Sequence, residues 1–166
     1  MRAVPDAVLL RLLPLRAAVV THTGEPGAGR GGPATPPVVD VSAALIQDEA
    51  GRYLVTRRRR GSHLEGLWEF PGGKREAGES AEAALRRELK EELSATFAVG
   101  ALVDTVRWEY PERVVVIAFY RCRLEAGTIA PGESQTMAWV APERLTKLEF
   151  PPADRALIAR LRAGSA

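Results

Sequence analysis

Gly72 to Ala95 read GGKREAGESAEAALRRELKEELSA, a glycine-rich loop followed by a helix-forming segment. Ser80 is suited to begin the helix, because its hydroxyl can accept from the free N–H groups of the first turn. No proline or glycine interrupts residues 80–93, and good helix formers fill them. The stretch therefore predicts an amphipathic helix from Ser80 to about Leu93.

The predicted helix carries a stripe of leucines beside a stripe of carboxylates. At roughly 100° per residue the apolar side is formed by Leu85, Leu89 and Leu93, and the acids beside it are Glu88, Glu91 and Glu92. Like charges three or four residues apart destabilise a helix by a few tenths of a kcal/mol per pair. A divalent cation bound by the carboxylate oxygens would offset that repulsion. The alternative is an acidic face that only meets water.

The spacing of these residues resembles the Nudix box of the Nudix hydrolase family, G-x5-E-x7-R-E-U-x-E-E-x-G-U, where U is aliphatic. Gly73 matches the first glycine, Glu79 the loop glutamate, and residues 87–92 the central acidic segment. Ser94 departs from the pattern, because the family has glycine there. A glycine suits a left-handed residue that closes the helix. Serine in that conformation costs on the order of 1 kcal/mol, so we expect a different local turn.

Length and composition fit one domain with a sizeable core, since the chain has 166 residues and 46% of them are apolar. The single cysteine, Cys122, excludes an intramolecular disulfide and favours a reducing, cytoplasmic location. Residues 38–166 carry 19 basic and 19 acidic residues, so they lack the basic footprint of a nucleic-acid-binding protein. We expect no nucleic-acid polymer and no membrane as partner, and either a monomer or a homodimer.

Residues 1–37 differ in composition from the rest. Residues 7–20 are apolar, but two arginines and a proline interrupt them, which argues against a membrane span and against a signal peptide. Residues 23–37 are rich in glycine and proline and predict a flexible linker. A disordered tail, a lineage-specific extension and an upstream start codon are the three explanations. We expect a disordered extension over residues 1–37 and one folded domain over residues 38–166.

The folded domain should contain two hairpins, a short strand and a final helix in addition to the helix of the box. A turn at residues 47–51 joins the first two strands into a hairpin, and Tyr110 to Glu112 join the second pair. The predicted strands cover residues 39–46, 52–56, 96–108, 113–124 and 136–141, with β-branched 114–119 central, and the last helix covers 153–162. This order favours an α/β class, a mixed β-sheet sandwiched between helices (α/β/α). The resemblance implies the same Nudix fold.

Flanking residues narrow the resemblance to the MutT type, which hydrolyses oxidised purine nucleoside triphosphates such as 8-oxo-dGTP. The matching blocks are residues 56–58, 69–74, 111–113 and 150–153. The resemblance implies a Mg²⁺-dependent nucleoside triphosphate pyrophosphohydrolase, with Mn²⁺ as an alternative metal. In such an enzyme water attacks the β-phosphorus and releases a nucleoside monophosphate and pyrophosphate. Its role would be to sanitise the nucleotide pool.

The resemblance also implies roles for individual residues. The metal ligands would be the Gly72 carbonyl, Glu88, Glu91, Glu92 and Glu133. The nucleotide pocket would be lined by Arg58, Phe70, Lys74, Arg113 and Asp154. The catalytic set would be Glu88, Glu91, Glu92, Glu133 and Arg87, with either Glu88 or Glu133 as general base and with Arg87 and Glu79 bracing loop and helix. Glu133 could instead be an exposed loop acid, and Arg113 a hairpin-edge arginine paired with Glu112.

Asp154 is the main departure from the MutT type, which has asparagine at this position. Asparagine offers a donor and an acceptor to a base edge, whereas an ionised aspartate only accepts. A raised pKa in an apolar pocket would restore the donor. A subgroup directed to cytidine triphosphate also carries Pro-Ala-Asp here, so a pyrimidine triphosphate is the alternative substrate. A cap on the last helix is compatible with both.

Three functions from other classes are also open. They are hydrolysis of ADP-ribose or another dinucleotide, nucleotide binding without cleavage, and a DNA-bound repair domain. The intact acids Glu88, Glu91 and Glu92 argue against a binding module. The neutral charge of residues 38–166 argues against a DNA-bound domain.

Overall fold

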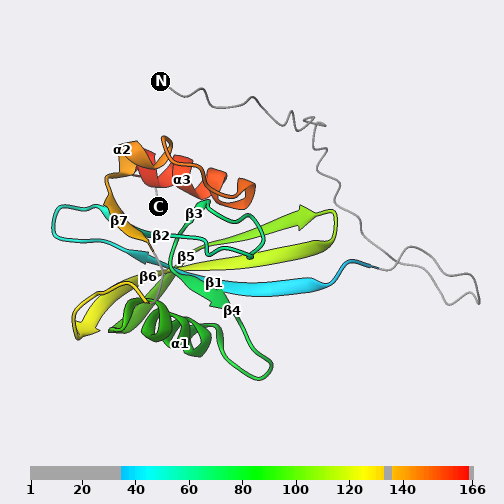
Figure 1. Cartoon of the computed structure of the whole chain (residues 1–166), viewed down its shortest axis with the longest axis horizontal. Coiled ribbons are helices and arrows are strands. Elements are labelled where there is room, and N and C mark those ends of the chain that lie inside the picture. The colour runs from blue at the N-terminus through cyan, green and yellow to red at the C-terminus, as the bar shows by residue number, and fades with distance from the viewer. Residues whose placement is uncertain (1–34, 133–135, 165–166) are drawn as a thin grey trace, which may run out of the picture. The chain divides into compact units, whose positions relative to one another are not determined.

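The structure of the chain is a computed structural model that describes residues 35–132 and 136–164, drawn in colour in Figure 1. The predicted extension over residues 1–37 falls outside the described residues except for its last three. Glu133, predicted as a metal ligand and catalytic residue, also lies outside them. Among the described residues, the first strand begins at Val38.

A four-stranded mixed sheet is built around strand β1 (Val38–Ile46), whose residues 42–46 are all buried. Burial on both faces makes β1 an interior strand. It pairs in parallel with β6 (Arg113–Ala126) and antiparallel with β4 (Gly72–Lys74). The edge strand β5 (Thr96–Tyr110) pairs with β6, which gives the order β4-β1-β6-β5. The second predicted hairpin and the inner position of residues 114–119 are confirmed.

The first predicted hairpin is wrong. β2 (Tyr53–Arg57) does not extend the sheet of β1 but lies in a separate antiparallel sheet between β3 (Trp68–Glu69) and β7 (Met137–Val140). The reason is that β4 and β6 already occupy both edges of β1. A single bridge between Gln47 and Tyr53 is what forms between the two strands. The turn itself is formed as predicted, with the Asp48 carboxylate accepting from the backbone N–H groups of Ala50 and Arg52.

Helices cover the strands from two sides (Figure 1). Helix α1 (Ala81–Leu93) buries its leucine stripe against Ala44 and Ile46 of β1, in a cluster that also contains Cys122. On the other side lie α2 (Pro142–Leu145), the 3₁₀ turn η1 (Pro152–Asp154) and α3 (Arg155–Ala163). The predicted α/β class with a mixed sheet between helices is confirmed, whereas β3, β4 and η1 were not predicted.

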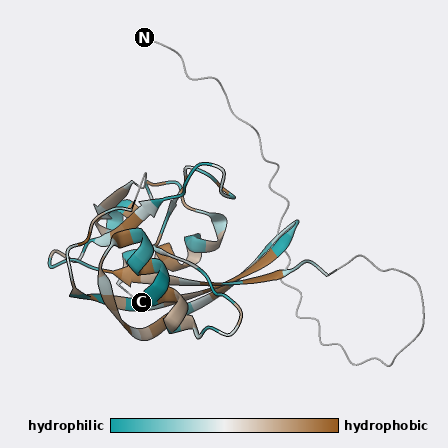
Figure 2. Cartoon of the chain, turned by 60° about the horizontal axis from the view of Figure 1, so that its bottom comes forward, coloured by the Kyte–Doolittle hydropathy of each residue, from teal (hydrophilic) through white to brown (hydrophobic). Residues whose placement is uncertain are grey.

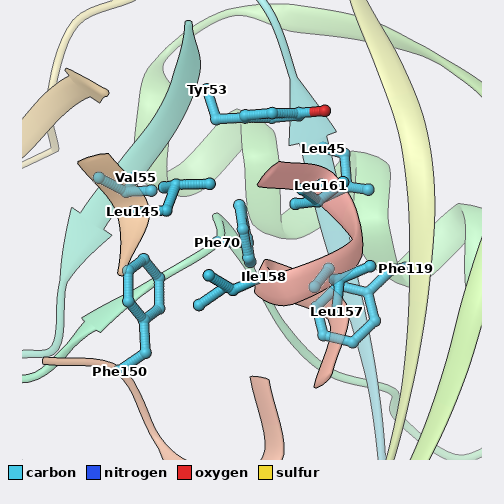
Figure 3. Packing of buried hydrophobic residues seen from close by; sticks show 11 residues of the cluster. Leu45, Tyr53, Val55, Phe70, Phe119, Leu145, Phe150, Leu157, Ile158 and Leu161 are labelled. Carbon is cyan, nitrogen blue, oxygen red and sulfur yellow. The ribbon is translucent and has the colours of Figure 1, made fainter. Parts of the chain in front are cut away.

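Phe70 lies in the middle of the second hydrophobic cluster, among side chains from β2, α2 and α3 (Figure 3). Its ring packs edge-on against Tyr53 and Phe119, with centroids 6.2 and 6.0 Å away, and lies 5.6 Å from Phe150. The hydropathy colouring of Figure 2 shows apolar ribbon along the strands that frame these clusters. Phe70 therefore anchors the chain just before β4.

Ser94 closes helix α1 in the left-handed conformation, with φ 56° and ψ 17°. Its backbone N–H donates to the Lys90 carbonyl at 3.1 Å, as in a glycine-capped helix. The expectation of a different turn is therefore wrong: serine adopts the turn that glycine would favour. The N-terminal prediction is confirmed, because the Ser80 hydroxyl accepts from the backbone N–H of Ala83.

Ser94→Gly should stabilise the domain by about 1 kcal/mol, because glycine has no Cβ to strain a left-handed residue. Ser80→Ala provides the comparison of opposite sign, with an expected loss of about 1 kcal/mol from the missing N-cap. Urea unfolding of the two variants beside the wild type measures both differences. A Ser94→Gly variant less stable than the wild type would show that the left-handed serine is not strained.

Candidate active site

Gly72 and Gly73 bring the backbone of β4 against two different neighbours. Gly72 has φ +146°, and a Cβ added to it would lie 2.1 Å from the backbone oxygen of Ser42. A Cβ on Gly73 would lie 2.2 Å from the Cδ atom of Glu88. The first glycine therefore permits the contact between β4 and β1, and the second leaves room for the Glu88 carboxylate.

The two alanine variants should separate stability from activity. Gly73→Ala meets only the end of a flexible side chain, so it should leave the fold intact, displace the Glu88 carboxylate and lower turnover by about tenfold or more. Gly72→Ala meets backbone and should destabilise the domain by about 2 kcal/mol or more. Turnover and urea unfolding of both variants test this. Equal stability losses at the two positions would contradict the assignment.

Arg87 connects the acids of α1 to the glycine-rich loop. Its guanidinium donates to both Glu79 oxygens at 2.9 Å, to Glu88 at 2.8 Å and to the Lys74 carbonyl at 3.2 Å. These hydrogen bonds lower the pKa of Glu79 to about 2. Glu91 lies 3.8 Å from the same guanidinium. Arg87 is thus placed to orient Glu88 and the loop, as a positioning residue.

The three helix acids are chemically suited to bind a divalent metal, although they do not form a complete coordination site by themselves. Among residues 35–132 and 136–164, no three His, Cys, Asp or Glu side chains converge closely enough to hold a metal ion. Glu88 turns to Arg87, and Glu92 accepts from the Gly72 backbone N–H at 3.1 Å. Mg²⁺ commonly takes one or two protein carboxylates and completes its shell with water and substrate phosphates. The carboxylate oxygens at this site meet that requirement.

A cleft of about 800 Å³ brings most of the predicted residues together. Strand β4 contributes its glycine backbone and Lys74, and α1 contributes acids. The other predicted nucleotide-binding residues come from other parts of the chain. The predicted residues that line it are Gly72, Lys74, Glu88, Glu91, Glu92, Arg58, Phe70, Arg113 and Asp154. Of the predicted residues that the structure describes, Arg87 is the exception, since it does not line the cleft. Phe70 is only 4% exposed, so it contributes mainly as floor and core.

One wall of the cleft holds two acids, the half-buried Glu69 and the buried Asp154, around one arginine. Arg58 pairs with Glu69 and donates its Nε–H to the His63 carbonyl at 2.7 Å. Burial raises the pKa of Glu69 to about 7, and Arg58 opposes that rise. Burial likewise raises the pKa of Asp154 to about 7 against the same arginine. Two carboxyl groups at this wall thus titrate near neutral pH.

Asp154 does not act as a helix cap, although it stands at the start of α3. Its side chain makes no capping hydrogen bond, and its backbone is helical rather than extended. With 5% exposure it is one of three buried polar or charged residues in the described part of the chain. The capping alternative is therefore wrong, and the carboxyl group faces the cleft that it lines.

Three further cleft residues were not assigned roles from the sequence. Glu69 belongs to the matched block 69–74, but its partner Arg58 becomes visible only when β2 pairs with β3. His63 and Tyr110 pack edge-to-face with ring centroids 4.9 Å apart and join the β2–β3 loop to the β5–β6 hairpin. Within the described residues the buried Nε2 atom of His63 has no hydrogen-bond partner. No local sequence signal marks this contact.

At the hairpin end of the cleft, Arg113 both lines the cavity and contacts Glu112, whose Oε1 atom is 3.4 Å from the Arg113 Nε atom. The edge-pairing alternative and the pocket role are thus compatible.

The whole segment that holds these residues matches a known family, since residues 42–160 fit the family model of the NUDIX domain. The chain belongs to the Nudix hydrolase family. This Nudix hydrolase is 36% identical over 124 residues to the 8-oxo-dGTP diphosphatase of Haemophilus influenzae, covering 75% of this chain and 91% of the relative. It is 35% identical over 126 residues to the CTP pyrophosphohydrolase of Escherichia coli, covering 76% and 93%.

A solved Nudix structure supports the fold in the same way. The crystal structure of the MutT protein from Methanosarcina mazei Go1 has a TM-score of 0.69 and 28% identity, and the match covers 78% of this chain and 96% of that one. The predicted family, fold and enzyme class, a hydrolase acting on diphosphate bonds, are confirmed. Nudix hydrolases generally use divalent metal ions. In the described residues of this Nudix chain, no helix is long and apolar enough to cross a membrane.

Proposed function

We propose that this Nudix hydrolase is a Mg²⁺-dependent nucleoside triphosphate pyrophosphohydrolase that acts on oxidised purine nucleotides such as 8-oxo-dGTP. The observation that carries the proposal is the cleft itself, which is lined both by the carboxylates of α1 and by the acids Asp154 and Glu69. Acids that suit a metal-bound phosphate chain and groups that suit a base edge thus share one cavity. The similarity to relatives named 8-oxo-dGTP diphosphatase supports the same substrate class.

The metal would be held by the Gly72 carbonyl and the carboxylates of Glu88, Glu91, Glu92 and Glu133, with Mn²⁺ as a substitute for Mg²⁺. When bound, it would screen the charge of the phosphates and lower the pKa of a bound water. Gly132, the residue before Glu133, donates its backbone N–H to the Glu92 carbonyl at 2.7 Å. That anchor fixes Gly132 at the end of α1, and this supports the proposed role of the residue that follows it.

Hydrolysis then requires a proton acceptor beside the attacking water. Either Glu88 or Glu133 removes the proton, a contribution worth about 10²–10⁴-fold in rate. Water attacks the β-phosphorus, the bond from that phosphorus to the α–β bridging oxygen breaks, and a nucleoside monophosphate and pyrophosphate leave. Arg87 would keep Glu88 oriented, and Lys74 and Arg113, which line the cleft, would contact the phosphates and the nucleoside.

Asp154 would read the base. Below its pKa of about 7 the carboxyl group is protonated and offers an O–H donor and a C=O acceptor. An asparagine offers the same pair, so the protonated acid can take its place toward an oxidised guanine. Above pH 7 the ionised group only accepts.

Pyrimidine triphosphates such as CTP are the second candidate substrate. An ionised Asp154 can accept from the amino group of cytosine, and one relative is named CTP pyrophosphohydrolase. The cytoplasmic location that the single cysteine favours and a monomeric or homodimeric state stay predictions.

The experiment is to incubate the purified full chain with Mg²⁺ and a panel of 8-oxo-dGTP, dGTP, CTP, dCTP and ADP-ribose, and to identify the products. We expect monophosphate and pyrophosphate from 8-oxo-dGTP, at higher kcat/KM than from dGTP. Preferential hydrolysis of CTP would favour the second candidate. Cleavage of ADP-ribose alone, or binding without any product, would overturn the proposal in favour of a dinucleotide hydrolase or a binding module.

A further inference from the structure

Arg58 and Arg59 are consecutive and both line the cleft, but their side chains approach different neighbours. Arg58 turns to Glu69 and lies close enough to Asp154 to affect its pKa. Arg59 lines the same cleft, and its terminal nitrogen NH2 lies 3.6 Å from the position that a Cβ of Gly132 would take. One cation of the arginine pair therefore lies beside Glu69, and the other lies beside Gly132.

The guanidinium of Arg59 lies close to the carboxyl-terminal end of α1. Gly132 is hydrogen-bonded to the Glu92 carbonyl, and its added Cβ would lie 3.1 and 3.3 Å from the carbonyl oxygens of Glu91 and Glu92. A helix carboxyl terminus favours a cation. Arg59 thus lies near the end of α1 that carries Glu91 and Glu92, two of the acids that would hold the phosphate chain.

The backbone around Arg59 is held in place, which limits where its side chain can reach. The Arg59 carbonyl accepts from the hydroxyl of Ser62 at 2.7 Å and from its backbone N–H at 3.3 Å. The Arg58 backbone N–H donates to the Leu67 carbonyl at 2.9 Å, and the Arg58 carbonyl accepts from the Gly66 N–H at 3.2 Å. A fixed attachment point lowers the entropic cost of holding the guanidinium in a binding position.

We propose that Arg59 binds the outer phosphates of the triphosphate, and the pyrophosphate that they become. This inference rests on the proposed function, because it assumes that the base lies at the Asp154 wall and the phosphates at the acids of α1. The γ-phosphate is then the group farthest from the base, and Arg59 is a cleft-lining cation near the acids of α1 that can meet it. Arginine suits this role because its planar guanidinium can donate two parallel hydrogen bonds to phosphate oxygens.

Arg60 supplies a matched control in the same loop. Its side chain is 98% exposed and lies 3.9 Å from Glu65, and it does not line the cleft. Arg59→Ala and Arg60→Ala remove the same charge from adjacent positions. Arg59→Lys keeps the charge and removes the planar fork.

The experiment measures inhibition of the full chain, in Mg²⁺, by inorganic pyrophosphate and by the nucleoside monophosphate product, together with KM for the triphosphate. Arg59→Ala should raise KM and the inhibition constant of pyrophosphate by about tenfold, leave that of the monophosphate unchanged, and be only partly rescued by lysine. Arg60→Ala should behave as the wild type. Equal pyrophosphate inhibition of the two alanine variants would overturn the inference, and so would a lowered melting temperature of Arg59→Ala with unchanged inhibition.

Calorimetric titration of pyrophosphate with Mg²⁺ into the same proteins separates this inference from the proposed function. Arg59-dependent binding of pyrophosphate in a protein that cleaves no triphosphate would retain the phosphate site and reject the enzyme. Normal triphosphate cleavage with no dependence of binding on Arg59 would reject the phosphate site alone.

Discussion

Glu92→Gln should lower turnover by about a hundredfold or more while the domain stays folded. The amide keeps an oxygen that can accept from the Gly72 backbone N–H, the contact that Glu92 makes at 3.1 Å. It loses the negative charge that a divalent cation needs from its ligands. The substitution should therefore leave the fold intact and weaken metal binding.

Pyrophosphate release at saturating Mg²⁺, beside circular dichroism and urea unfolding, measures both effects. Glu82→Gln is the control, because Glu82 is an exposed acid in the first turn of the same helix. It should retain wild-type turnover. Near-normal turnover of the Glu92 variant would remove that residue from the proposed metal site.

Asp154→Asn should make the domain more stable at pH 8 and shift its base preference toward oxidised guanine. Burial raises the pKa of Asp154 from its ordinary 3.8 to about 7, so the folded chain holds a proton that the unfolded chain has lost between these values. The free energy of unfolding of the wild type therefore falls as the pH rises through that window. Asparagine carries no charge, so the variant should gain about 2–4 kcal/mol at pH 8 and almost nothing at pH 4.

Urea unfolding of both proteins at pH 4 and pH 8 tests the stability part. The exposed Asp40 on β1 provides the control, and Asp40→Asn should show no such pH-dependent gain. The ratio of kcat/KM for 8-oxo-dGTP to that for CTP tests the base preference. An unchanged ratio would exclude Asp154 from base reading, and an equal gain at both pH values would exclude a buried, proton-linked carboxyl group.

The Nudix box could be located from the sequence because the interactions that shape its helix are local. The cap at Ser80, the leucine stripe and the acids all depend on helical spacing within residues 80–93, and the structure retains each of them. The sequence could not show in the same way that β1 and β2 lie in different sheets. Adjacent strands often form a hairpin, but here β6 arrives from about 70 residues away and takes the edge of β1 in parallel.

The burial of Glu69 and Asp154 at one wall of the cleft could not be predicted from the sequence either. Glu69 and Asp154 owe their raised pKa values to burial, and burial arises only when β3 and η1 pack into the folded domain. The contact of His63 with Tyr110 likewise joins two loops that no periodicity connects. The sequence nevertheless identifies Asp154 as a candidate. The MutT type has asparagine at the matched position, and aspartate presents different hydrogen-bonding groups to a base edge.

Cys122 lies buried behind α1, where burial raises the pKa of its thiol to about 12. At neutral pH the sulfur therefore stays in its unreactive S–H form, and peroxides attack the thiolate. The position of the only cysteine of this chain therefore protects its sulfur from oxidation through the thiolate.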